Sequence, residues 1–266
     1  MMEEVVNKYL KYLKVKREEP SLNYLQRLIQ HHLTYIPYET FSKFYYYTLA
    51  PDYIPPLPLF VDNLVEKGWG GTCFTLNMNF ARLLTELGYE CSLVKVEPGH
   101  IAIMVEIKVR KFYVDVGYGS PIMKPIELDK VTRLVMHGFG EEIIFTKQSS
   151  HIFEIDRRSN GKTFVKKQII WEPLSEDDIR DDIRASYFDS DDNITMRRIT
   201  AVRFNGQKCF YLRNGTMKVM TFRNISEIKM NETDKWVKHI HEIYQIDKTS
   251  LLESLDFLAE RNVKIF

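Results

Sequence analysis

The sequence predicts an α+β fold, because helical and strand-like patterns occupy different parts of the chain. Apolar residues recur at helical spacing through much of the first 90 positions and again in the last 35, whereas alternating patterns fill the region between them. Asparagine–glycine pairs at 160–161, 205–206 and 214–215 separate short apolar runs, as expected for β-hairpins. Regularly spaced strands of this kind indicate a barrel or a strongly curved sheet.

Helices are expected first along the chain. Ser21 is a candidate N-cap directly after Pro20, and Gly68 and Gly88 stand where helices should end. The predicted elements of this part are two helices within 2–34, a proline-rich loop at 50–58, a short helix at 60–67 and a helix at 73–87.

Strands follow, because the apolar period falls from about 3.6 to two after position 90. The predicted strands are 91–97, 101–109, 111–117, 142–147, 151–157, 162–170, 197–204, 207–213 and 216–222, and two closing helices are expected at 232–244 and 251–260. An acidic helix start at 176–182 separates the two groups of strands.

Composition excludes several classes of protein. The chain has 266 residues, of which 44% are hydrophobic and 27% charged, as in globular proteins with a large core. Its 37 basic and 36 acidic residues give a net charge of +1, so no strong field favours nucleic acid or an anionic membrane. No run approaches the roughly 18 apolar residues of a membrane span. We therefore expect a cytoplasmic protein with a small-molecule partner, and neither nucleic acid nor membrane as partner.

The three cysteines have to be explained one at a time, since they are widely spaced and form no C-x-x-C pair. Cys91 and Cys209 fall in apolar strands and are interpreted as core residues. Cys73 opens a predicted helix, where free N–H groups and the helix dipole lower the pKa of a thiol. Gly70 and Gly71 before it would let a substrate approach the sulfur. The alternative is that Cys73 is simply a small buried hydrophobic residue.

A base and an acid lie further along the same half of the chain. His100 follows Pro98-Gly99 at a strand start, and Asp115 stands in an otherwise apolar strand, where an unpaired carboxylate is costly. With one turn between them, two antiparallel strands can bring the pair together. Cys73, His100 and Asp115 are the residue types of a nucleophile, a base and a group that orients the base. Taken alone, Asp115 could equally cap the next turn.

Four segments together match a known family. They are GG-x-C opening a helix that ends in LGY, an H-x-x-h-x-V strand start, DVGYG, and HHLTYIPYETF at 31–41. This combination resembles the arylamine N-acetyltransferases. The resemblance implies a catalytic triad of Cys73, His100 and Asp115 in a cysteine-protease-like core. It also implies a helical lobe (1–90), a β-barrel lobe (91–196) and a C-terminal α/β lid (197–266).

The resemblance implies acetyl transfer from acetyl-CoA to an arylamine or hydrazine through an acetyl-cysteine, with no metal. It places coenzyme A contacts at Gly99 and at Tyr118, Gly119 and Ser120, although a segment such as 117–120 is more often a plain turn. A related thiol acyltransferase, amide synthase or hydrolase with another acyl donor could use the same three catalytic residues, and a binding module with lost activity is a further alternative.

The chain departs from the family pattern close to the nucleophile. Trp69 stands where the family usually has arginine, Thr75 where it commonly has an acid, and Thr40 where it has asparagine. The family arginine is expected to meet the acid that corresponds to Glu39. We therefore expect Glu39 to lack its usual partner and Trp69 to fill the vacated volume.

Overall fold

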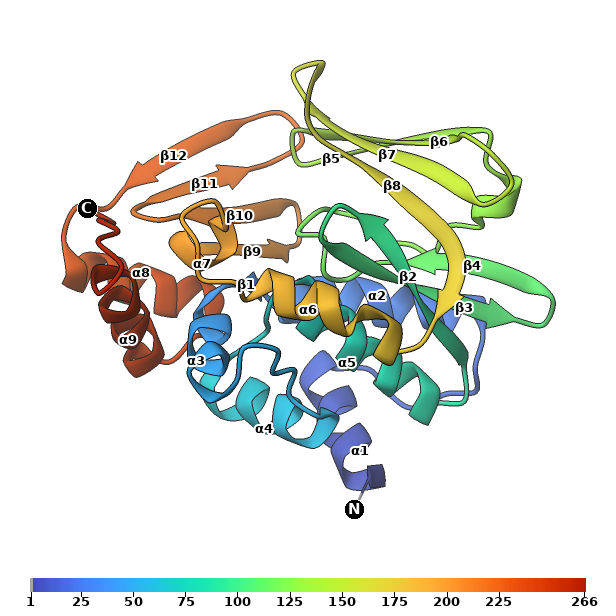
Figure 1. Ribbon diagram of the computed structural model, residues 1–266, viewed down its shortest axis with the longest axis horizontal. Helices are drawn as coiled ribbons and strands as arrows, with labels where there is room; N and C mark the ends of the chain where they lie inside the picture. Colours follow the sequence, from blue (N-terminus) through green and yellow to red (C-terminus); the bar gives the residue numbers. More distant parts are fainter. Residues whose placement is uncertain (1) are drawn as a thin grey trace.

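The helices of the first third of the chain lie together on one side of the computed structural model, which describes residues 2–266 (Figure 1). They are α1 (Met2–Leu13), α2 (Leu22–Tyr35), α3 (Phe41–Leu49), α4 (Leu57–Lys67) and α5 (Cys73–Glu86). Ser21 caps α2, because its hydroxyl accepts a hydrogen bond from the Tyr24 amide at 3.2 Å. Gly68 ends α4 in the left-handed conformation, as the sequence predicts.

A seven-stranded antiparallel sheet forms the second part of the fold, with strand order β4-β3-β2-β8-β7-β6-β5. Its strands are β2 (Glu90–Glu97), β3 (His100–Ile107), β4 (Arg110–Val114), β5 (Arg133–Gly138), β6 (Glu141–Lys147), β7 (Ile152–Ser159) and β8 (Lys162–Leu174). Register shifts between Leu93 and Lys95 and between Arg157 and Arg158 are expected to increase its curvature. The curled sheet encloses an apolar core that includes Phe145.

A second, five-stranded antiparallel sheet has the order β1-β9-β10-β11-β12. Its strands are β1 (Tyr38–Glu39), β9 (Thr200–Asn205), β10 (Lys208–Arg213), β11 (Thr216–Met220) and β12 (Ile225–Lys229). Tyr38 pairs with Val202, so the segment before α3 joins a sheet made from the C-terminal part of the chain. This pairing connects the N-terminal helical part of the chain to the C-terminal sheet.

Short helices connect the two sheets and longer helices close the chain. They are η1 (Leu128–Lys130), η2 (Asp177–Ile179), α6 (Arg180–Ser186), α7 (Ile194–Arg197), α8 (Thr233–Tyr244) and α9 (Lys248–Ala259). In Figure 1, α6 crosses the middle of the molecule, and α8 and α9 lie beside the five-stranded sheet. α5 packs against β2 and β3, which places the helix start beside the curled sheet.

The predicted α+β class is confirmed. Its helices, its curled sheet and its Asn-Gly hairpins all occur within the described residues. Six elements have no counterpart among those predicted from the sequence, namely β1, α3, η1, β5, α7 and β12. The third predicted strand, expected over 111–117, ends at Val114, which leaves Asp115 in the loop that follows.

Candidate active site

The glycine pair before α5 is pressed against the chain around Pro37. A Cβ on Gly70 would lie 1.9 Å from the Pro37 carbonyl oxygen, and one on Gly71, whose φ is +140°, would lie 2.7 Å from Thr75 Cβ. The Glu39 amide also donates to the Gly71 carbonyl at 2.9 Å. Only glycine fits at these two positions, and this tight loop fixes where the first turn of α5 presents Cys73.

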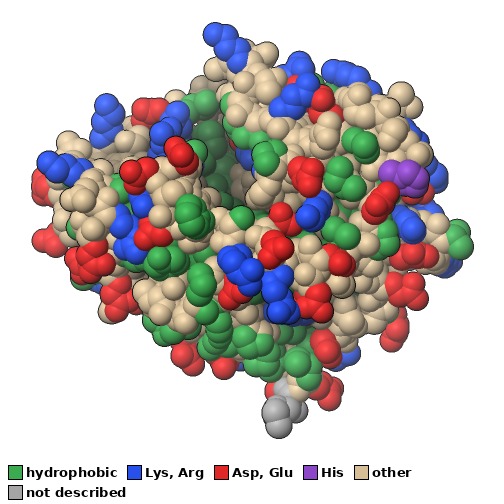
Figure 2. All heavy atoms as spheres, viewed as in Figure 1, with side chains coloured by type: hydrophobic (Ala, Val, Ile, Leu, Met, Phe, Trp, Pro, Cys, Tyr) green, Lys and Arg blue, Asp and Glu red, His purple; other side chains and the backbone are tan. Residues whose placement is uncertain are grey.

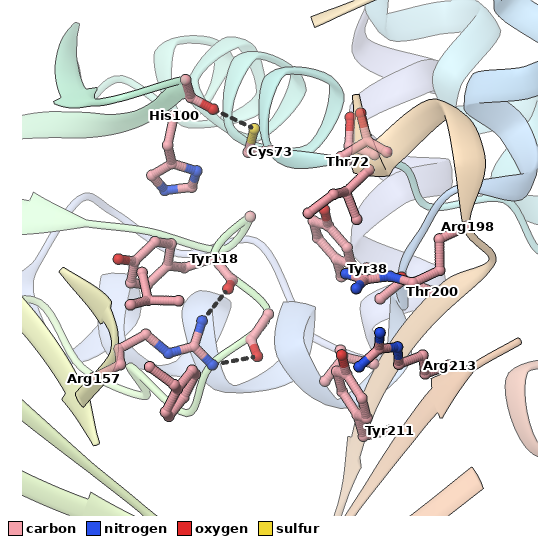
Figure 3. Close-up of a pocket in the computed structure, with 18 of the residues that line it drawn as sticks. Tyr38, Thr72, Cys73, His100, Tyr118, Arg157, Arg198, Thr200, Tyr211 and Arg213 are labelled. Carbon is pink, nitrogen blue, oxygen red and sulfur yellow. Dashed lines mark hydrogen bonds between the residues drawn. The ribbon is translucent and has the colours of Figure 1, made fainter. Parts of the chain in front are cut away.

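Cys73, His100 and Asp115 come from the start of α5, the start of β3 and the loop directly after β4, and Figure 3 shows Cys73 beside His100. β3 and β4 pair antiparallel, which brings His100 and Asp115 to one edge. His100 Nε2 lies 2.7 Å from Asp115 Oδ2, and both side chains are buried. The other ring nitrogen is free to interact with Cys73, whose Sγ lies 4.0 Å from the carbonyl oxygen of Gly99, the residue before His100.

The charges at this site favour a thiolate beside an imidazolium. Burial alone raises the pKa of the Cys73 thiol, but the His100 hydrogen bond and the charges of His100, Lys43 and Lys167 lower it below its usual value. Burial lowers the pKa of His100, but the Asp115 carboxylate and Cys73 together raise it to about 9. Burial raises the pKa of Cys91 to about 12. Cys73 is therefore expected to be much more reactive than Cys91.

Besides His100, three other groups hold the Asp115 carboxylate. Its Oδ1 accepts hydrogen bonds from Asn77 Nδ2 and the Gly117 amide, both at 3.0 Å. Its Oδ2 also accepts one from the Tyr113 hydroxyl at 2.8 Å. Asn77 and Tyr113 are not among the site residues predicted from the sequence. The spacing held a signal for each, because Asn77 lies one helical turn after Cys73 and Tyr113 two positions before Asp115.

A cleft of about 950 Å³ opens onto Cys73 and His100. Figure 2 shows the molecule hollowed on this face, above the middle of the view. Gly99, Tyr118 and Gly119 line the cleft, whereas Ser120 is buried behind it. Of the four residues expected near coenzyme A, three therefore border the cavity directly.

Arg157 fixes the loop that carries Tyr118. Its guanidinium donates to the carbonyls of Tyr118 and Gly119 at 2.9 and 3.2 Å (Figure 3). It also forms an ion pair with Glu141 at 2.7 Å. The ring of Tyr118 lies 4.5 Å from that of His100, centre to centre. The loop therefore forms a firm wall beside the imidazole.

The cleft is electropositive although the chain as a whole is nearly neutral. Six basic side chains line it, from Lys43, Arg157, Lys167, Arg198, Arg213 and Lys218. Two acidic side chains line it as well, and each is already paired, Glu141 with Arg157 and Asp182 with Lys95 at 2.8 Å. The excess positive charge suits an anionic ligand.

The three departures from the family pattern are all buried. Trp69 packs against Tyr46 and donates from Nε1 to Ser250 Oγ at 2.9 Å, so it is integrated into the core. Thr75 packs against Gly71. The Thr40 hydroxyl accepts from the Thr200 amide at 3.1 Å.

Glu39 is the acid whose usual partner the chain lacks. Its carboxylate accepts hydrogen bonds from the Ser42 amide and hydroxyl, at 2.9 and 2.6 Å. Among residues 2–266, no basic side chain forms an ion pair with it. Burial raises the pKa of Glu39 to about 7, against the lowering effect of the Ser42 hydrogen bonds.

The described part of the chain contains neither a cluster of metal ligands nor a membrane-spanning helix. No group of three or more His, Cys, Asp and Glu side chains there is arranged to hold a metal ion. Between residues 2 and 266, no helix is both long and apolar enough to cross a membrane.

Comparison with known proteins identifies the family. A family model described as N-acetyltransferase matches residues 21–250. Proansamycin X synthase of Amycolatopsis mediterranei is 26% identical over 237 residues, which cover 79% of this chain and 87% of that protein. An arylamine N-acetyltransferase of Gallus gallus, the pineal gland isozyme NAT-3, is 27% identical over 125 residues and 42% of each chain.

Solved structures share the fold. The arylamine N-acetyltransferase of Mycobacterium marinum in complex with CoA superposes with a TM-score of 0.81 at 16% identity, over 98% of this chain and 99% of that one. The enzyme from Salmonella typhimurium gives a TM-score of 0.79 at 14% identity, over 95% and 98% of the two chains. Since the family model spans most of the sequence, the chain belongs to the arylamine N-acetyltransferase family and is an acyltransferase.

Proposed function

We propose that this protein transfers an acetyl group from acetyl-CoA to an arylamine or hydrazine through an acetyl-Cys73 intermediate. The observation that carries the proposal is the placement of Cys73 and of a His100 imidazole held by Asp115 in the lining of one electropositive cleft. Catalytic roles for these three residues are part of the proposal.

In the first half-reaction, the Cys73 thiolate attacks the carbonyl carbon of acetyl-CoA. A bond forms between that carbon and the Cys73 sulfur, and the bond to the coenzyme A sulfur breaks. Free N–H groups in the first turn of α5 stabilise the oxyanion as the charge develops. The proton on His100 passes to the departing thiolate, so coenzyme A leaves as a thiol and His100 becomes neutral.

In the second half-reaction, the amine nitrogen attacks the acetyl-Cys73 carbonyl carbon. The new carbon–nitrogen bond replaces the carbon–sulfur bond, and the excess proton of the amine passes to His100. Asp115 holds the ring through Nε2, which keeps the other nitrogen directed at the reacting atoms. An arylamine is largely unprotonated at neutral pH, so it needs positioning more than activation.

Acetyl-CoA is the cosubstrate that best fits the charge of the cleft. Arg213 and Lys218 line both this cleft and an adjoining cavity of about 720 Å³, which Lys229 also lines. We assign the phosphates of coenzyme A to this basic end. Gly99, Tyr118 and Gly119 then border the thioester end beside Cys73, and Ser120 is buried in the same loop. The Mycobacterium marinum relative has been solved with CoA, which supports this choice of cosubstrate.

A second candidate function is amide formation from a bulkier acyl donor. The two adjoining cavities share Phe164 and Tyr211 and leave room for a longer acyl chain. The relative from Amycolatopsis mediterranei is itself described as a synthase. Replacing acetyl-CoA by thioesters of longer acids distinguishes the two functions, because a synthase of this kind would favour the longer chain.

Three further expectations belong to this proposal. We place the protein in the cytoplasm, acting on small molecules without nucleic acid or membrane as partner. We also keep the division into lobes at 1–90, 91–196 and 197–266 as a proposal.

Intact-protein mass spectrometry tests the proposed transfer directly. Brief incubation with acetyl-CoA should add one acetyl group at Cys73, and an arylamine chase should remove it. Cys73→Ser should remain unmodified under these conditions, while Cys91→Ser, the matched control, should be acetylated normally. If Cys73 alkylates readily with iodoacetamide but never takes up acetyl from acetyl-CoA, the proposed function is wrong.

A further inference from the structure

Lys43 is a buried cation on the wall of the cleft. Its side chain is 2% exposed, and its ammonium donates to the Ser186 carbonyl at 2.7 Å and to Thr195 Oγ1 at 2.8 Å. The ring centre of Tyr187 lies 4.8 Å away. No carboxylate between residues 2 and 266 pairs with Lys43, and its contacts use two of its three N–H donors.

Lys43 is near enough to the nucleophile for their charges to interact. The ammonium helps to lower the pKa of the Cys73 thiol. Burial lowers the pKa of Lys43 to about 8, and the Cys73 thiolate counteracts that effect. At neutral pH, Lys43 is therefore still charged, and the thiolate is the anion that stabilises it in the resting enzyme.

Acetylation of Cys73 removes this stabilising anion. The thiolate becomes a neutral thioester, and coenzyme A carries its phosphates away when it leaves. Without the thiolate, the pKa of Lys43 falls further, because burial is no longer opposed by a neighbouring anion. The acceptor binds to this acetylated state, so an anionic group on the acceptor would restore the lost charge balance.

The surroundings of Lys43 suit an aromatic ring that carries such a group. Tyr38 and Phe74 line the cleft with Cys73, and Figure 3 shows Tyr38 across the cavity from Tyr118. Ser186 and Thr195, which hold the ammonium, line the same cleft. An aromatic amine with its nitrogen at the thioester can therefore direct a substituent along this wall toward Lys43.

We propose that the preferred acceptor is an aromatic amine bearing a carboxylate or similar anion, which Lys43 binds. The inference rests on the proposed acetyl transfer and names the acceptor class for it. The carboxylate keeps its charge throughout and takes no part in the bond changes at nitrogen and sulfur. Arg213 and Lys218 lie at the end assigned to coenzyme A, and Arg157 is already paired with Glu141. Lys167 also acts on Cys73 and is compared directly with Lys43 below.

Equilibrium binding tests the acceptor class without any chemistry. In a Cys73→Ala background, which lacks the thiolate, 3- and 4-aminobenzoate would be compared with their neutral amides by calorimetry. At least one carboxylate should bind roughly tenfold more tightly than its amide, the effect of one charge-assisted hydrogen bond. Adding Lys43→Met should bring the two affinities together, whereas Lys43→Arg should retain the preference.

Lys167→Met is the matched control. It removes one positive charge from the same cleft, and its charge also acts on Cys73, so any general effect of lost charge is shared by the two variants. The carboxylate preference should survive in Lys167→Met. Equal affinity for carboxylate and amide in the Cys73→Ala protein, or an equal loss of preference in both lysine variants, would overturn the proposal. Thermal unfolding confirms that each variant is folded.

Discharge of preformed acetyl-enzyme separates this inference from the proposed function. If acetyl-CoA does not acetylate Cys73, the transfer is wrong, and the binding comparison still decides the Lys43 site. If acetyl-Cys73 forms but aminobenzoate and aminobenzamide discharge it equally fast, only the acceptor class is wrong. Support requires faster discharge by the carboxylate, and loss of that advantage in Lys43→Met but not in Lys167→Met.

Discussion

Four hydrogen bonds converge on the Asp115 carboxylate, two at each oxygen. Oδ2 receives both His100 Nε2 and the Tyr113 hydroxyl, while Asn77 and the Gly117 amide hold Oδ1. A carboxylate with all its positions used cannot rotate freely, so it fixes the plane of the imidazole. The Tyr113 hydroxyl also shares an oxygen with His100, which weakens the pull of that oxygen on the ring proton.

Removing the Tyr113 hydroxyl should therefore change the acid–base behaviour of the site. In Tyr113→Phe, Asp115 should interact more strongly with His100 and raise the pKa of His100 further, so the alkaline limb of the pH–rate profile should move upward. We expect kcat/KM to fall a few-fold as the carboxylate becomes less well held. The rate of Cys73 alkylation between pH 5 and 10 measures the same shift.

Tyr9→Phe is the control for this variant. Tyr9 is equally buried, and its hydroxyl has no hydrogen-bond partner among the described residues. An identical pH profile for Tyr113→Phe and wild type, with Tyr9→Phe also unchanged, would show that the Tyr113 hydroxyl does not act on the pair.

Glu39 should make the stability of the protein depend on pH. Its folded pKa of about 7 lies above the ordinary value of 4.5. Its contribution is therefore fully present below pH 4.5 and is lost as the pH rises through 7, because the unfolded state releases the proton first. The loss is roughly 3 kcal/mol. Glu39→Gln should abolish this part of the dependence, which urea unfolding at pH 5.5 and pH 8 would measure. Parallel pH dependence in both proteins would contradict the assignment.

Asn77 and Tyr113 are site residues that were not predicted from the sequence. Residue type and spacing pointed to Cys73, His100 and Asp115, because a thiol, an imidazole and a buried acid are unusual enough to be noticed. Asn and Tyr are common in helices and strands, and their importance here depends on which neighbour the fold supplies. Lys43 was overlooked for the same reason, since nothing local indicates that its ammonium is buried in the cleft.

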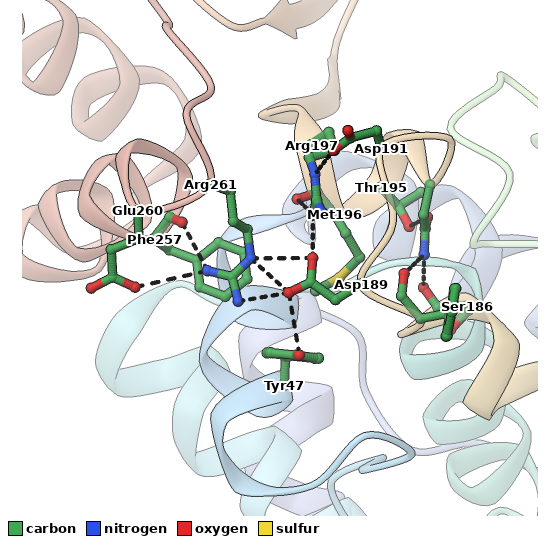
Figure 4. A network of polar contacts seen from close by, with 12 residues as sticks. Tyr47, Ser186, Asp189, Asp191, Thr195, Met196, Arg197, Phe257, Glu260 and Arg261 are labelled. Atoms are coloured by element: carbon green, nitrogen blue, oxygen red, sulfur yellow. Dashed lines mark hydrogen bonds and ion pairs between the residues drawn. The ribbon is translucent and has the colours of Figure 1, made fainter.

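At the scale of elements, the segment around α7 is held by a network of ion pairs (Figure 4). Asp189 accepts hydrogen bonds from Arg197, from Arg261 at 3.1 Å and from Tyr47 at 3.3 Å. This joins the loop before α7 to α3 and to the end of α9. Since Thr195 lies in α7 and contacts Lys43, the network also supports one wall of the cleft.

Breaking this network should cost more than breaking an ordinary surface ion pair. Asp189→Asn weakens contacts to two largely buried arginines at once, so we expect a loss of roughly 1–2 kcal/mol in the free energy of unfolding. The matched control is Asp177→Asn, which removes an exposed pair with Arg180 and should change little. Denaturant unfolding measures both, and equal small losses would show that the network is not important for stability.

The elements that were not predicted from the sequence carry weak local signals. β1 is two residues long and exists only because Tyr38 pairs with Val202, far along the chain. Every residue of β12 is exposed, so this strand has no alternation to detect. α3 is rich in aromatic residues, which gives a weak helical preference, and its position is decided by packing. Periodicity is clearest in elements such as α1, which buries Val6, Tyr9, Leu10 and Leu13 on one face.

At the scale of the whole molecule, a chain with a net charge of +1 concentrates basic side chains in one cleft. The net charge therefore describes the balance of the whole chain but does not predict the basic cleft. Local charge of this kind raises the concentration of an anionic substrate near the nucleophile.

Salt should weaken acetyl-CoA binding more than it weakens the binding of a neutral acetyl donor. The KM for acetyl-CoA should rise several-fold between about 0.02 and 0.3 M ionic strength, because added salt shortens the Debye length and screens the basic side chains from the phosphates. The KM for 4-nitrophenyl acetate should stay nearly constant over the same range. A parallel response of both donors would show that the basic residues do not bind the phosphates. Arg213→Ala should flatten the dependence for acetyl-CoA alone.

The pairing of Tyr38 with Val202 has a consequence for how the protein is made. A ribosome releases the chain from its N-terminus, so Cys73 emerges well before the strands at 200–220 that complete the cleft. Cys73 and α5 are thus synthesised early. The strands at 200–220, which supply basic side chains to the cleft, are synthesised only near the end of translation. A truncated product should therefore contain the thiol without the cavity that gives it selectivity.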